Sequence, residues 1–163
     1  MAYRNKTYIA FDGDTDMYYY NLMKAWKQSD NTNFNFNDAH DLNTARDTSE
    51  TESIKKQLRE RMANSKMFIL LLGKNTKRLT RFVKWEVEHA MFLKLPIIVV
   101  NLNNKRTVDE DRMPSWLDEY SCISCSFNAK IIQYSLEQWE LLFDENENGH
   151  YPWKETVYSY LGL

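Results

Sequence analysis

One carboxylate stands out by its neighbours in the sequence. Glu86 lies in the stretch 80–90, which stands between two apolar runs and carries the aromatic residues Phe82 and Trp85. Apolar residues recur in this stretch at spacings of three and four, so the pattern predicts a helix that packs one face on a sheet. Glu86 would then lie near the start of a helix that leaves the carboxyl end of a strand, where open α/β sheets bind ligands. We interpret Glu86 as the candidate catalytic group, against the alternative of a solvated surface acid.

A second set of candidates follows the first apolar run, residues 7–11, where Asp12 and Asp14 occupy a short acidic turn. The segment 9–15 fits the DxDxT pattern of haloacid-dehalogenase-type phosphatases, in which Asp12 would be the nucleophile and Asp14 the general acid. Those enzymes also need acidic magnesium ligands after a later strand, and residues 97–104 offer none. The phosphatase is therefore a minor alternative. The same two carboxylates could instead cap their own turn and the following helix.

The cysteines and histidines do not make a metal site by spacing. Cys122 and Cys125 form a single CxxC, and His40, His89 and His150 lack the spacing of a zinc ligand set. In an extended segment the two thiols would point to opposite faces. We predict two buried thiols, no metal and no resident cofactor.

Composition limits the function further. The chain has 163 residues, of which 43% are hydrophobic and 27% charged, and a net charge of −2. This predicts a globular single domain over 1–163 and gives no basic field for nucleic acid. No apolar run approaches the ~20 residues that span a bilayer, and no signal peptide is recognisable. We expect a cytoplasmic protein with no membrane or nucleic-acid partner. The glycine-rich phosphate loops GxGxxG and GxxxxGK[ST] are absent.

Strand and helix patterns alternate over the first 127 residues. This predicts an α/β fold, a flavodoxin-like three-layer α/β/α domain with a central five-stranded, mainly parallel sheet. The expected strands are 7–11, 33–37, 67–72, 96–101 and 122–127, with helices at 17–28, 80–94 and 114–120 and one opened by a capping box at Ser49 and Glu52. Residues 38–50 read as a long polar loop. We expect a core of about 6–127 and a C-terminal extension, 128–163, that packs on it as a short extended piece and two helices.

Four stretches, taken together, resemble a bacterial TIR domain of the kind found in Thoeris anti-phage defence. They are Tyr8–Asp12, Phe34–Asp38, Asn64–Lys66 and Phe82–Val87, the last resembling the family's W-[CV]-x-x-E-[LI] motif. The resemblance implies cleavage of the nicotinamide–ribose bond of NAD, with NAD as substrate, and formation of a cyclic ADP-ribose-type nucleotide. That nucleotide would diffuse to a separate effector protein, and a homo-oligomer is expected.

The resemblance also implies residue roles. Glu86 is the catalytic residue of the family motif, and its carboxylate would stabilise positive charge on the ribose. Phe11 and Trp85 would offer an apolar wall to the dinucleotide, and Asp12 and Asp14 would contact its ribose or amide groups. Each of these four has a structural alternative, core packing for the aromatic residues and capping for the acids.

Two departures from the family pattern concern the site. Phe82 stands where the family has Trp, and Ala10 stands where many relatives have Ser. The loop 38–50 or a second protomer would exclude water from the site of the reaction. His89 is more readily explained as a surface or packing residue. The other class of function is an interaction module that only assembles with other TIR domains.

Overall fold

A parallel sheet forms the centre of the molecule. The structure, a computed structural model, describes residues 6–28, 36–37 and 51–163. Within them six strands pair in the order β2-β1-β3-β4-β5-β6, and every neighbouring pair is parallel. The strands are β1 (Thr7–Ala10), β2 (Phe36–Asn37), β3 (Met67–Leu72), β4 (Ile97–Asn101), β5 (Cys122–Ser126) and β6 (His150–Pro152). Because they are parallel, the carboxyl ends of neighbouring strands meet at one edge.

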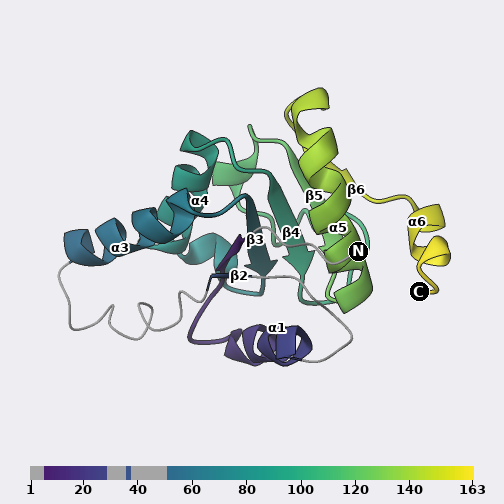
Figure 1. Ribbon diagram of the computed structural model, residues 1–163, viewed down its shortest axis with the longest axis horizontal. Helices are drawn as coiled ribbons and strands as arrows, with labels where there is room; N and C mark the ends of the chain where they lie inside the picture. The colour runs from purple at the N-terminus through teal and green to yellow at the C-terminus, as the bar shows by residue number, and fades with distance from the viewer. Residues whose placement is uncertain (1–5, 29–35, 38–50) are drawn as a thin grey trace.

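Helices cover both faces of this sheet. They are α1 (Met17–Gln28), α3 (Thr51–Ala63), α4 (Val83–Phe92), α5 (Ala129–Leu142) and α6 (Glu155–Tyr160), with the short 3-10 helices η1 (Thr76–Arg78), η2 (Ser115–Leu117) and η3 (Phe143–Glu145). Buried residues of α1 and α5 share one core cluster, and those of α3 and α4 share the other. In Figure 1, α3 and α4 lie on the left of the sheet and α5 on the right.

The two core clusters follow from the alternation of side chains along each strand. In β1, Tyr8 and Ala10 pack on the α3/α4 side, whereas Ile9 and Phe11, which follows the strand, pack on the α1/α5 side. All six residues of β3 are buried, as expected for a central strand with helices on both faces. The direction of each side chain near the carboxyl edge is thereby fixed by its position in the strand.

The fold predicted from the sequence is confirmed in its class and in its five core strands. The helix expected at 17–28 is α1, and the glutamate helix expected at 80–94 is α4, shortened to Val83–Phe92. The helix at 114–120 is only a 3-10 turn. Ser49, most of the second strand and the loop 38–50 lie outside the described residues.

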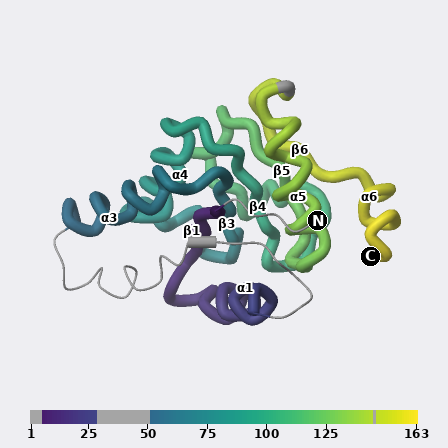
Figure 2. The backbone as a smooth tube through the Cα atoms, in the orientation of Figure 1, coloured from purple at the N-terminus to yellow at the C-terminus, as the bar shows by residue number. Residues whose placement is uncertain are grey.

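The prediction for the C-terminal extension was wrong in two places. No extended piece precedes its first helix, because Asn128 caps α5 directly through a 2.9 Å hydrogen bond from the backbone N–H of Lys130. The last helix was expected to begin at Tyr151, but His150–Pro152 instead adds β6 to the edge of the sheet beside β5. Figure 2 shows the chain running from α5 through this strand to α6 at the right of the molecule. Trp139 of α5 and Tyr158 of α6 are buried in the α1/α5 core cluster.

Both cysteines are buried thiols on opposite faces, as predicted, with Cys122 in one core cluster and Cys125 in the other. In the part of the chain that the structure describes, none of the helices is long and apolar enough to cross a membrane.

Candidate active site

Glu86 is buried and held by a hydroxyl. The residue is 1% exposed, and the Tyr8 hydroxyl donates a 2.7 Å hydrogen bond to its Oε2. A buried carboxylate is stable only where donors replace the water it has lost. This bond joins α4 to β1, residues 78 apart in sequence. The surface-acid alternative for Glu86 is therefore wrong.

The chain leading into α4 determines where Glu86 lies. β3 ends at Leu72, and η1 and a turn follow before the helix begins at Val83. The backbone N–H of Glu86 bonds to the carbonyl of Phe82 at 2.7 Å, so Glu86 stands in the first turn. The amino-terminal end of a helix carries partial positive charge, which favours an ionised carboxylate there. The end of the helix and the Tyr8 hydroxyl thus both lie beside this carboxylate.

Trp85, the next residue along the helix, faces a different environment. Its ring stacks on His89 at 5.4 Å, and Lys55 and Arg59 of α3 lie 5.4 and 5.9 Å from its centroid. The ring therefore lies on the side of α4 toward α3. Burial, and then the nearby Arg59, lower the pKa of His89 below its ordinary value. Contact between Trp85 and a substrate stays a prediction.

The acidic turn after β1 is organised by its own hydrogen bonds. Asp12 is 5% exposed and accepts bonds from the backbone N–H of Asp14 at 3.0 Å and from the Thr15 hydroxyl at 2.7 Å. This is the capping role that the sequence left open for Asp12. Asp14 contributes its backbone to the turn, and its side chain is exposed. A substrate contact by either carboxylate stays a prediction.

Phe11 belongs to the other side of the sheet. Its ring is 1% exposed and stacks on Tyr20 of α1 at 4.6 Å, in the core cluster that excludes Tyr8. The structure thus brings Glu86 together with Tyr8 and Phe82, and not with Phe11. Tyr8 was missed at the sequence level, although it is the one hydroxyl in the strand that faces α4.

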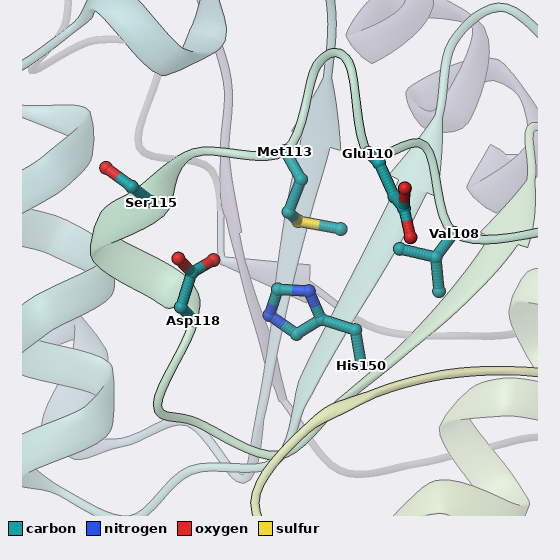
Figure 3. A pocket seen from close by; sticks show the side chains of 6 residues that line it. All are labelled: Val108, Glu110, Met113, Ser115, Asp118 and His150. Atoms are coloured by element: carbon teal, nitrogen blue, oxygen red, sulfur yellow. The ribbon is translucent and has the colours of Figure 1, made fainter.

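A hollow of about 370 Å³ lies between the segment 108–118 and β6, and none of the predicted site residues lines it. Figure 3 shows its lining side chains, Val108, Glu110, Met113, Ser115, Asp118 and His150. Among the residues described by the structure, no cluster of three His, Cys, Asp or Glu side chains could hold a metal ion.

A parallel α/β sheet with a buried glutamate at the start of the helix after β3 agrees with the TIR-like class. Residues 8–107 match the family described as Thoeris protein ThsB, TIR-like domain, which is more than half of the chain. The chain belongs to this family, and with it to the TIR-domain proteins of a defence system. Glu86, Tyr8 and the acidic turn all lie inside the matched region; α5, β6 and α6 lie outside it.

Proposed function

We propose that the protein cleaves the nicotinamide–ribose bond of NAD and converts the ADP-ribosyl part into a cyclic ADP-ribose-type signal in anti-phage defence. One observation carries the proposal. Glu86, which lies inside the region that matches the family, is buried at the start of α4 and hydrogen-bonded by Tyr8. A carboxylate held in a site that excludes water interacts with developing positive charge far more strongly than it would in water.

The chemistry requires little more than such a carboxylate. The C1′–N bond breaks, and its electron pair leaves with nicotinamide, which changes from a cationic pyridinium to a neutral base. No general acid is therefore needed. Positive charge develops on the ribose in an oxocarbenium-like transition state, which ionised Glu86 would stabilise. NAD is the substrate in this scheme, and no resident cofactor or metal takes part.

The burial of Glu86 bears on the outcome and on the control of the reaction. With water excluded, an atom of the same ADP-ribosyl group can attack C1′ and close a ring before hydrolysis occurs. A side chain that is 1% exposed also has to become accessible before NAD can reach it. We therefore propose that a trigger of the defence response, or assembly of several copies, opens the site.

Chromatography of small molecules from phage-challenged cells tests this proposal. Cells expressing the protein should lose NAD and gain a cyclic nucleotide in the ADP-ribose mass range, and Glu86→Gln should abolish both changes. Glu88→Gln is the matched control, because Glu88 is on the same helix, is half exposed and pairs with Lys84 at 3.8 Å. Unchanged nucleotides in triggered wild-type cells would rule out the NAD-cleaving function.

A non-catalytic assembly role is the second candidate, and a surface feature of α4 favours it. Phe92 is 79% exposed and stacks on His89 at 5.9 Å, which in turn stacks on Trp85. An exposed aromatic ring that continues a row of partly buried ones suits contact with another protein. If the protein only assembles, Phe92→Ser should abolish defence and reduce its size in sedimentation, whereas Glu86→Gln should leave both unchanged.

A further inference from the structure

A second pocket opens at the carboxyl ends of β1, β3 and β4, at the edge where α/β sheets bind ligands. Its volume is about 470 Å³, within the range of small-molecule sites. It is lined by Thr15, Asp16, Tyr19, Gly73, Lys74, Asn75, Leu102, Asn103 and Arg112. Glu86 is not among these residues, and Tyr19 and Leu102 belong with the α1/α5 core cluster, on the face of the sheet opposite Tyr8.

The unusual group in this pocket is the Asp16 carboxylate. Asp16 is 6% exposed, and its Oδ2 is buried with no hydrogen-bond partner among the described residues. It lies against Gly73, where a Cβ atom would overlap the carboxylate. Burial, and then the charge of Asp12, raise the pKa of Asp16, although Thr15 and the charge of Arg112 act in the opposite direction. A buried carboxylate without a full set of donors is costly to keep, so a ligand that supplies a donor would relieve it.

Two cations line the same pocket. The backbone N–H of Arg112 bonds to Asp109 Oδ1 at 3.3 Å, and its Nε lies 4.0 Å from Asp109 Oδ2. The guanidinium therefore has Asp109 nearby, and Arg112 also lines the pocket, where its charge acts on Asp16. Lys74 is exposed and makes no ion pair or hydrogen bond with the described residues. Asp109 itself is well bound, since Asn103 also donates to its Oδ2 at 2.7 Å.

We propose that this pocket binds a phosphorylated sugar, with Arg112 and Lys74 holding the phosphate and Asp16 accepting a hydroxyl of the sugar. Arginine and lysine are the side chains that bind phosphate in proteins. A carboxylate is the acceptor that proteins place on ribose hydroxyls. The half-buried Tyr19 and the Asn75 amide add polar groups around the same space. The inference rests on this pocket alone and does not depend on the chemistry proposed for Glu86.

Binding measurements on the purified full chain test the proposal with three probes: ribose 5-phosphate, ribose and inorganic phosphate. The wild-type protein should bind ribose 5-phosphate at least about tenfold more tightly than either fragment, because a hydrogen bond to a charged group contributes about that factor. Arg112→Gln and Lys74→Gln should each weaken ribose 5-phosphate about tenfold. Arg78→Gln is the matched control, an exposed cation on η1 that does not line the pocket, and should leave binding unchanged.

Asp16→Asn tests the contact with the sugar separately from the contact with the phosphate. Removing a negative charge should leave phosphate binding the same or tighter, while the preference for ribose 5-phosphate over phosphate should fall at least about tenfold. Circular dichroism checks that each variant is folded, and Lys74→Gln, at an exposed side chain, keeps the test valid if Arg112→Gln disturbs the fold. The proposal is overturned if the wild-type protein does not bind ribose 5-phosphate at millimolar concentration. It is equally overturned if Arg78→Gln weakens binding as much as Lys74→Gln, or if Asp16→Asn keeps the full preference.

Discussion

Removing a single oxygen atom from Tyr8 tests how firmly the candidate catalytic carboxylate is held. Tyr8→Phe deletes the donor that lies 2.7 Å from Glu86 Oε2 and leaves the aromatic ring, which is buried and stacks on Phe68 at 5.4 Å. No cavity larger than the hydroxyl results. A hydrogen bond to a charged group contributes about 1.5–3 kcal/mol, so we expect the free energy of unfolding to fall by about 2 kcal/mol. For a chain of this length that lowers Tm by roughly 4–8 °C.

Urea denaturation followed by tryptophan fluorescence measures this change, since the chain has five tryptophans. The slope of the free energy of unfolding against urea concentration should stay the same, because the surface area exposed on unfolding does not change. Tyr160→Phe is the control: Tyr160 is 83% exposed, and losing its hydroxyl should cost less than about 0.5 kcal/mol. A double-mutant cycle with Glu86→Gln should give a coupling energy of about 1 kcal/mol or more. The reasoning would be refuted if Tyr8→Phe and Tyr160→Phe lowered the free energy of unfolding equally, or if the coupling energy were near zero.

Three further predictions concern the buried polar groups. Burial, followed by Asp12, raises the pKa of Asp16 above its ordinary 3.8, so the ionised group destabilises the folded chain at neutral pH. Asp16→Asn should therefore raise the free energy of unfolding at pH 7, and in urea titrations this gain should shrink as the pH falls through the raised pKa toward 3.8. Gly73→Ala should lower Tm, because the added methyl group would overpack against the Asp16 carboxylate at a cost of roughly 1–3 kcal/mol. Adding Asp16→Ala to this variant should restore the lost stability, because it removes the carboxylate. Burial raises the pKa values of Cys122 and Cys125 to about 12, so a thiol reagent at pH 8 should label them only after denaturation; labelling of the native protein would contradict this.

The fold was predictable from the sequence because its signals are periodic and long. The run 67–72 is apolar throughout, as expected for a strand covered on both faces, and the spacing of Val83, Val87 and Ala90 fits one buried helix face. β6 was missed for a physical reason. It has three residues, one of them proline, and it gains its pairing from the edge of β5 rather than from its own pattern.

The site was predictable only in part. Glu86 follows from its helix and from the family motif, whereas its partner Tyr8 is 78 residues away and depends on which face of β1 points toward α4. Strand alternation offered a usable signal, since Tyr8 shares its face with Ala10. Asp16 and Arg112 gave no such signal, because the loops that bring them to one pocket follow different strands. Phe11 was proposed as a wall for the dinucleotide with core packing as the alternative, and strand alternation places its ring against Tyr20 of α1.

The most direct test of the account is the release of nicotinamide by lysates of phage-challenged cells supplied with NAD labelled in the nicotinamide ring. Cells expressing the wild-type protein or Glu88→Gln should release the label, and cells expressing Glu86→Gln should not exceed cells that lack the protein. The account is contradicted if Glu86→Gln, present at the same level and folded, releases nicotinamide as fast as the wild type.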